Sequence, residues 1–153
     1  MDVRDFTALA ERLDPASLAS RLNRFYRIAS ERIFHYDGTL DKLQGDSVMA
    51  FFGEPFHVPD HAERAVKCAL DILSLQQIVE PEPLPVGAGI ASGEAFVGNV
   101  GQEDVADFTV LGDTVNVASR LQGAAAPGEL LVSEPTYLAV RSSTRMRRHG
   151  SLS

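Results

Sequence analysis

Two aspartates 44 positions apart, Asp2 and Asp46, are the first residues in the sequence whose type and spacing could do chemistry. Asp2 opens a segment, residues 2–7, that leads into an expected helix, and Asp46 lies at an expected hairpin turn. An aspartate at a two-residue turn is ordinarily a turn former. Two aspartates at the ends of neighbouring strands can instead hold a pair of divalent cations against a polyphosphate. From these two residues alone both interpretations stay open.

A second polar pair lies in the segment that follows Gly112. Asn116 and Arg120 are four residues apart, so on a helix an amide and a guanidinium lie side by side on one face. Val117 and Leu121 beside them are apolar, which places the pair at the edge of a buried stripe. A solvated polar face is the simpler interpretation. An arginine at such an edge also offers a fixed fork of donors that suits phosphate oxygens.

The elements that position these residues follow from hydrophobic periodicity and from turn residues. Asp14-Pro15 is typical of a helix start, Asp60 to Glu63 has the spacing of a capping box, and Ser133 is an expected cap. Tight turns are expected at Gly45-Asp46 and at 92–94. Helices are expected at 15–36, from 60, at 113–121 and from 135, and strands at 39–44, 47–52, 86–91, 95–100, 108–111 and 129–132. This order predicts an α+β fold in which helices cover a mainly antiparallel sheet.

Composition excludes several classes of protein. The 153 residues suit a single domain, and 14 basic against 21 acidic residues argue against a nucleic-acid binder. The basic cluster at Arg145, Arg147 and Arg148 is interpreted as a solvated end. The single Cys68 cannot form an internal disulfide, and no apolar run approaches the ~18 residues of a membrane span. With no secretory signal pattern after Met1, we expect a cytoplasmic protein without a membrane span in this segment.

Three glycines suggest a dinucleotide site that the sequence does not support. Gly87, Gly89 and Gly93 are spaced one residue differently from the dinucleotide fingerprint, and the residues after them are strand-like. A dinucleotide-binding site needs its glycines to open a helix whose N-terminus faces the pyrophosphate. We therefore expect these glycines to let strands turn and pack closely.

Three segments in order, 2–7, 38–46 and 108–120, make the chain similar to a known family. The sequence resembles the catalytic domain of the class III nucleotidyl cyclases, the adenylate and guanylate cyclases, and most of all the bacterial homodimeric adenylate cyclases. The strand segment 86–101 also follows the family pattern. The resemblance implies the family's ferredoxin-like, palm-type, mainly antiparallel sheet with packed helices, in one catalytic domain that spans residues 1–153.

The resemblance implies a metal and phosphate site at the start of the chain. Asp2, Asp46 and the backbone carbonyl of Val3 would bind two divalent cations, Mg²⁺ or Mn²⁺. The backbone N–H groups around Phe6 and Thr7, at a helix start, would suit the β- and γ-phosphates of the nucleotide.

The resemblance also implies how ribose, α-phosphate and base would be held. Asn116 would orient the ribose, and Arg120 would stabilise charge on the α-phosphoryl oxygens. Lys42 can donate to adenine N1, and Thr109 can accept from the 6-amino group, whereas guanylate-specific members carry Glu and Cys at these places. The implied reaction converts ATP to 3′,5′-cyclic AMP and pyrophosphate. Because relatives share each site between two chains, a homodimer with active sites at the interface is implied.

Some features depart from the family pattern. The stretch Glu103-Asp104-Val105 lacks an arginine found in many relatives, and Asp5 stands where relatives often have glycine. The family strand before Asp2 and the strands after 150 are missing, so we expect a fragment, truncated at both ends, of a longer protein with further domains. The alternative is a weakly active or inactive cyclase-homology module that binds nucleotide or dimerises to relay a signal. A guanylate cyclase and a palm-type polymerase are less favoured.

Overall fold

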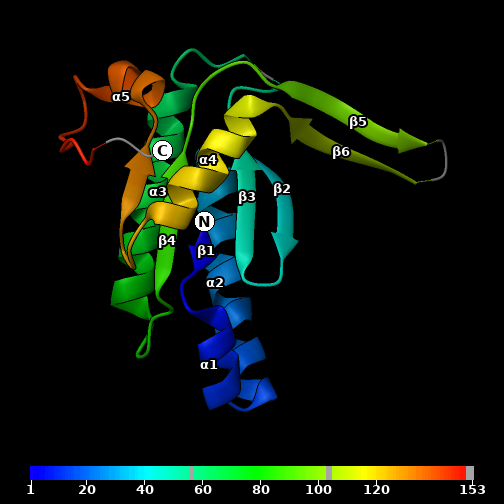
Figure 1. The fold of residues 1–153 in the computed structure, drawn as a ribbon, viewed down its shortest axis with the longest axis vertical. Coiled ribbons are helices and arrows are strands. Elements are labelled where there is room, and N and C mark those ends of the chain that lie inside the picture. The colour runs from blue at the N-terminus through cyan, green and yellow to red at the C-terminus, as the bar shows by residue number, and fades with distance from the viewer. Residues whose placement is uncertain (56, 103–104, 151–153) are drawn as a thin grey trace.

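The computed structural model describes residues 1–55, 57–102 and 105–150. A central five-stranded sheet has the order β2-β3-β1-β4-β7, and β5 with β6 forms a separate arm that extends away from the body (Figure 1). The strands are β1 (Asp2–Val3), β2 (Thr39–Gln44), β3 (Ser47–Phe51), β4 (Val86–Ile90), β5 (Phe96–Gln102), β6 (Val105–Leu111) and β7 (Leu130–Val132). The helices are α1 (Phe6–Arg12), α2 (Pro15–His35), α3 (His61–Val79), α4 (Asp113–Ala124) and α5 (Glu134–Val140).

The predicted α+β class is confirmed, and so is the mainly antiparallel sheet. The pairs β1–β3, β1–β4, β2–β3 and β5–β6 are antiparallel, and β4–β7 is parallel. No helix among the described residues is long and apolar enough to cross a membrane.

Alternate residues of β4 separate the two faces of the central sheet. Val86 and Ala88 are buried in the main core, which also holds Phe25 of α2 and residues of α3. Gly87 and Gly89 alternate with these residues, so a side chain added to either would project from the other face. At Gly89 it would meet the backbone of α4, and at Gly87 the carbonyl oxygen of Ala125, the residue after α4. Helices α2 and α3 therefore cover one face, and α4 lies on the opposite face, which we call the open face. The prediction that these glycines allow close packing is confirmed.

The predicted hairpin between 86–91 and 95–100 is wrong. β4 pairs with β1 on one side and with β7 on the other, so neither edge is free for β5. β5 pairs instead with β6, in a register that runs from Phe96 opposite Leu111 to Gln102 opposite Val105. The strand predicted at 108–111 is thus the second half of a longer strand, and residues 103–104 lie outside the described residues. The segment 92–94 leads from the central sheet to the arm.

The helices α2, α3 and α5 begin where the sequence predicts, but only one of the three predicted side-chain caps forms. Asp14 caps α2, since its Oδ1 accepts from the Ser17 N–H at 3.0 Å. The predicted capping box at Asp60 is wrong: its carboxylate makes no cap bond and accepts from Arg64 Nε at 2.9 Å. A hydrogen bond to a charged guanidinium is stronger than one to a neutral N–H, which accounts for the difference. Ser133 precedes α5 as predicted, but its hydroxyl makes no cap bond.

Candidate functional site

Asp2 and Asp46 lie side by side in the central sheet. Asp2 is held on both sides, because it pairs with Ser47 of β3 and with Gly87 of β4. Asp46 lies in the turn between β2 and β3, and its carbonyl accepts from the N–H of Val3 at 3.1 Å. The side chain of Val3 is buried in the main core, so that of Asp2 is directed to the open face. The structure therefore brings the two predicted metal ligands together.

The charges around these carboxylates oppose one another. Burial raises the pKa of Asp46, and the neighbouring charge of Asp2 raises it further. The guanidinium of Arg4 acts in the opposite direction on the pKa of Asp46. Its Nη2 lies 3.5 Å from Asp2 Oδ1, and its Nη1 donates to the carbonyl of Gly123 at 3.2 Å. One arginine thus partly balances two close negative charges.

The donor set at Asp2 and Asp46 fits hard divalent cations. Carboxylate oxygens are ligands that Mg²⁺ and Mn²⁺ prefer, and a bound cation would relieve the repulsion that raises the pKa of Asp46. Within the described parts of the chain no group of three or more histidine, cysteine or acidic side chains could hold a metal. The further ligands would be waters, phosphate oxygens and a backbone carbonyl such as that of Val3, as is usual for Mg²⁺.

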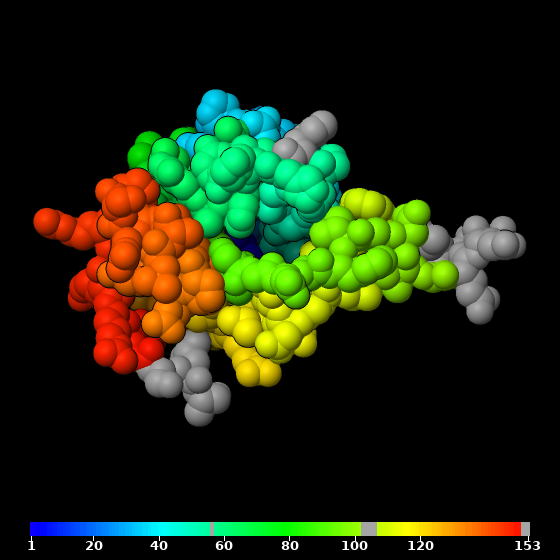
Figure 2. Space-filling view, turned by 90° about the horizontal axis from the view of Figure 1, so that it is seen from above, coloured from blue at the N-terminus to red at the C-terminus, as the bar shows by residue number. Residues whose placement is uncertain are grey.

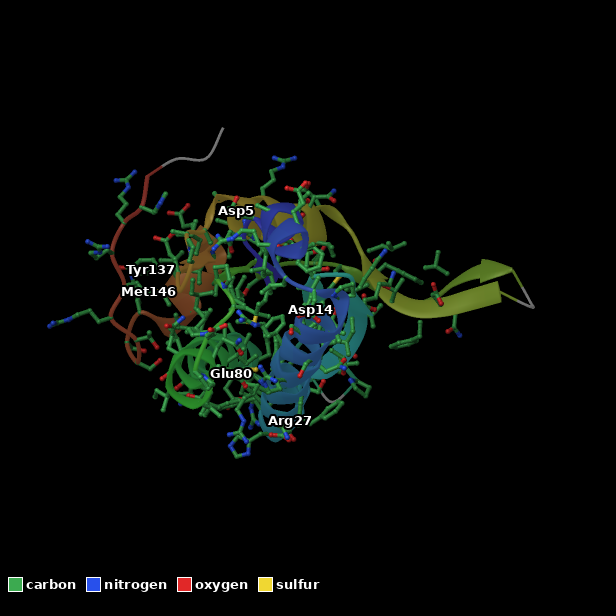
Figure 3. The ribbon with its side chains drawn as sticks, turned by 90° about the horizontal axis from the view of Figure 1, so that it is seen from below. Asp5, Asp14, Arg27, Glu80, Tyr137 and Met146 are labelled. Carbon is green, nitrogen blue, oxygen red and sulfur yellow. The ribbon has the colours of Figure 1, made fainter. Side chains whose placement is uncertain are left out.

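The predicted phosphate-binding segment begins α1. Phe6 packs against the main core, so only its backbone could face a nucleotide, and Thr7 is exposed. The first N–H groups of a helix have no partner within it and favour anions. Asp5, at the start of α1 in Figure 3, is exposed and has a left-handed φ of 52°. Glycine adopts this conformation without a steric cost, so a glycine would suit this position better than an aspartate.

A β-bulge determines where Lys42 points. Leu40 pairs with Ala50 and Lys42 with Met49, so Asp41 is an extra residue in β2. Leu40 and Ala50 pack against the main core. Because side chains alternate and cross-strand partners share a face, the bulge moves Lys42 to the open face. Its exposed ammonium makes no ion pair with any side chain that the structure describes.

Thr109 in β6 lies next to this bulge. It is 5% exposed, and its hydroxyl donates to Asp41 Oδ2 at 3.1 Å. Thr109 is therefore hydrogen-bonded to the residue that directly precedes Lys42, the other predicted base-reading residue. No pattern in the sequence points to Asp41, because its contact with Thr109 depends on the bulge in β2.

Asn116 and Arg120 lie on α4 as predicted. Both are exposed, and neither side chain forms a hydrogen bond or ion pair with the described residues. Leu121 beside them is buried against β7. Since α4 lies on the open face, the carboxylates, the lysine and this polar pair are all on the side of the sheet away from α2 and α3.

A cavity of about 710 Å³ opens at the end of the molecule opposite α1, between β3, β4, α3 and α4. Figure 2 shows a hollow at this end. Of the described residues that line it, which include Met49, Cys68, Gly89 and Ser119, none is a predicted site residue. The candidate site is an open surface rather than this cavity.

Comparisons with known proteins agree with this geometry. The family model described as "Adenylate and Guanylate cyclase catalytic domain" matches residues 1–153. Adenylate cyclase 1 of Rhizobium meliloti (strain 1021) is 36% identical over 129 residues, which are 80% of this chain and 19% of that protein. An adenylate cyclase of Mycobacterium bovis is 31% identical over 154 residues, 99% of this chain and 34% of that protein. The chain thus spans well under half the length of these relatives.

Solved structures of both specificities resemble the chain. The crystal structure of the adenylyl cyclase CyaB from P. aeruginosa has a TM-score of 0.90 and 33% identity, over 99% of this chain and 83% of that one. The guanylyl cyclase Cya2 has a TM-score of 0.85 and 32% identity, over 97% of this chain and 78% of that one. Overall similarity therefore does not separate ATP from GTP.

Proposed function

The chain belongs to the adenylate and guanylate cyclase catalytic domain family, and on that premise we propose that it is an adenylate cyclase that converts ATP to 3′,5′-cyclic AMP and pyrophosphate. The observation that carries the choice of ATP is the hydrogen bond from Thr109 to Asp41, the residue directly before Lys42, at the bulge in β2. We also propose that residues 1–153 act as one catalytic domain in the cytoplasm, where ATP is available.

The base choice follows from hydrogen-bond complementarity. Adenine presents an acceptor at N1 and a donor at its 6-amino group. The ammonium of Lys42 only donates, and it is exposed on the open face, so it can serve N1. The hydroxyl of Thr109 can accept from the amino group. Guanine reverses both polarities, with a donor at N1 and an acceptor at O6, so the contact from Lys42 to N1 would be lost and the hydroxyl of Thr109 could no longer act as an acceptor.

In the proposed reaction the 3′-oxygen of ATP bonds to the α-phosphorus as the bond from that phosphorus to the β-phosphate oxygen breaks. Asn116 orients the ribose, so that the 3′-oxygen is in line with the breaking bond. Arg120, four residues further along α4, donates to the α-phosphoryl oxygens as their charge grows. The first N–H groups of α1 bind the β- and γ-phosphates.

Asp2, Asp46 and the carbonyl of Val3 would hold the two divalent cations that this proposal requires. When bound, such cations neutralise charge on the triphosphate and favour the deprotonated 3′-hydroxyl. Asp46 is suited to this work, because burial and the charge of Asp2 raise the pKa of its carboxyl group and a neighbouring cation would offset both effects.

Exposed apolar side chains on the arm support a homodimer with active sites at the interface. A two-stranded ribbon is marginal in water by itself, and an apolar surface on it is typical of a contact with a partner. On one face of the ribbon the exposed side chains are Phe96 at 57%, Val100 at 39% and Leu111 at 47%, and Phe108, at 56%, lies on the other face. We expect sedimentation to show a dimer and Phe96→Asp to weaken both the dimer and turnover. A monomer that retains full activity would contradict this part of the proposal.

A weakly active or inactive cyclase-homology module is the second candidate. The acidic stretch at 103–105, which lies partly outside the described residues, and the exposed carboxylate of Asp5 beside the predicted phosphate segment favour it. A module of this kind would bind nucleotide or dimerise while forming little or no cyclic AMP.

An exchange of the base-reading residues tests the proposal. Lys42→Glu combined with Thr109→Cys should lower kcat/KM for ATP by at least about a hundredfold, since two contacts of roughly tenfold each are lost. Lys67→Glu, which changes the same charge on the exposed side of α3, is the matched control and should leave turnover unchanged. Unchanged ATP turnover in the double variant would contradict the assignment.

A further inference from the structure

We propose that Asp41 sets the hydrogen-bonding polarity of Thr109 and thereby makes the proposed base site at Lys42 and Thr109 accept a 6-aminopurine and reject a 6-oxopurine. This inference rests on the proposed adenylate cyclase function and deepens it by one specificity-determining residue. Asp41 acts through Thr109, so it is a positioning residue.

A threonine hydroxyl alone cannot separate the two purines. It carries one proton and two lone pairs, so it can donate to a 6-oxo group as readily as it accepts from a 6-amino group. In this structure the hydroxyl proton of Thr109 already has an acceptor, because Thr109 Oγ1 donates to Asp41 Oδ2 at 3.1 Å. With its proton directed at the carboxylate, the hydroxyl presents only lone pairs to a ligand. Thr109 is 5% exposed, so little water competes for that proton.

The bulge in β2 brings the carboxylate of Asp41 to Thr109. In a regular strand Asp41 and Lys42 would point to opposite faces of the sheet. The extra residue shifts the register after Leu40, so that Lys42 pairs with Met49 and Asp41 reaches across to β6. Bulges next to active sites commonly redirect a side chain in this way.

The second oxygen of the same carboxylate is an unused acceptor. Asp41 Oδ1 is buried and has no hydrogen-bond partner among the residues that the structure describes. Buried polar atoms are normally paired, so this carboxylate keeps an uncompensated charge, which strengthens the hydrogen bond that it accepts from Thr109. The hydroxyl oxygen can then only accept, as a 6-amino group requires. A 6-oxo group would face that acceptor, and both oxygens would be left unpaired.

The experiment measures kcat/KM for ATP relative to that for GTP, in the full chain. Asp41→Asn keeps the size of the side chain but replaces one acceptor by a donor, and we expect the ATP/GTP ratio to fall by about tenfold or more. Asp41→Ala frees the proton of Thr109 and should lower the ratio as well, so it serves if Asp41→Asn does not fold. Glu31→Gln, which removes a carboxylate from the exposed side of α2, should leave the ratio unchanged.

A double-mutant cycle with Thr109 separates positioning from a general structural effect. Thr109→Ser keeps the hydroxyl and should keep the ratio, whereas Thr109→Val lowers it. In the Thr109→Val background Asp41→Asn should change the ratio no further, because its partner is already gone. A fall of the same size in that background would overturn the claim that Asp41 acts through Thr109. An unchanged ratio in both single variants of Asp41 would overturn the inference altogether.

Nucleotide binding distinguishes failure of this inference from failure of the proposed function. If the chain prefers ATP in turnover and Asp41→Asn leaves that preference intact, the inference fails while the function stands. If no cyclic product forms, the affinities for fluorescent analogues of ATP and GTP replace turnover as the readout. A preference for the ATP analogue that Asp41→Asn removes would support the inference although the proposed reaction has failed. The absence of any preference in the unaltered chain would overturn it.

Discussion

Replacing Gly89 by alanine should move α4 away from the sheet and disable the site without unfolding the protein. A Cβ at this position would lie 2.2 Å from the backbone nitrogen of Gln122 and 2.5 Å from the carbonyl oxygen of Ala118. Ordinary contacts begin at 3.4 Å, so α4 would have to shift by about 1.2 Å. Both obstructing atoms belong to the helix backbone, so a change of side-chain rotamer cannot relieve the clash.

The expected magnitudes follow from that shift. Overpacking of this kind costs about 1–3 kcal/mol, which lowers the Tm of a chain of this size by roughly 2–12 °C. Asn116 and Arg120 move with α4, and a misplacement of ~1 Å can cost about a hundredfold in rate. Turnover per folded molecule should therefore fall far more than the folded fraction does.

Thermal unfolding followed by circular dichroism and cyclic-nucleotide formation at 25 °C together check this prediction. Gly123→Ala is the matched control: this glycine also lies in α4, but a Cβ added to it would meet nothing within 4 Å outside its own helix backbone. That substitution should stabilise the helix by about 0.5–1 kcal/mol. An unchanged Tm and rate in Gly89→Ala would refute the packing argument. A lowered Tm with an unchanged rate per folded molecule would refute the link between α4 and the chemistry.

Three further predictions concern single side chains. Asp46→Asn should raise the Tm of the metal-free protein, because a carboxyl group with a raised pKa destabilises the fold when it is charged. The rise in Tm should be full at pH 7 and should shrink as the pH falls toward 3.8, where the carboxyl group is protonated. A Tm that does not rise at pH 7 would contradict this. Asp5→Gly should be tolerated, because glycine adopts the φ of 52° without strain. It should also lower the KM for ATP, measured by initial rates, because it removes a negative charge beside the predicted phosphate-binding segment. A raised KM would argue against phosphate binding at that segment. Cys68 is 2% exposed and burial raises its pKa to about 12, so a thiol reagent at pH 8 should label it only on unfolding. Rapid labelling of the folded protein would contradict this and would show that the reagent reaches the thiol through the cavity that it lines or through an opening of α3.

The elements were largely predictable because each has a local signal. Periodic apolar residues and the Asp14 cap define α2, and Gly45-Asp46 defines the turn between β2 and β3. Which strands pair is not a local property. The sequence segments on either side of 92–94 look like a hairpin, yet both edges of β4 are taken by strands distant in the chain. Only the competition among all strands for those edges decides the pairing.

The site could be predicted as far as its residues follow family motifs. The order of the family motifs placed Asp2 with Asp46, and the four-residue spacing put Asn116 on the same helix face as Arg120. The contribution of Asp41 was not predictable from spacing, because it depends on a one-residue bulge and on a contact 68 positions away in the chain. Alternation in a regular strand would have placed Lys42 on the wrong face of the sheet.

The most direct test of the central claim is the identity of the product that the chain forms from equal concentrations of ATP and GTP with Mn²⁺. The proposed function predicts that cyclic AMP exceeds cyclic GMP by at least about tenfold, that one pyrophosphate accompanies each cyclic AMP, and that Asp46→Asn abolishes both. Cyclic GMP as the main product, or cyclic AMP formation that survives Asp46→Asn undiminished, would contradict it.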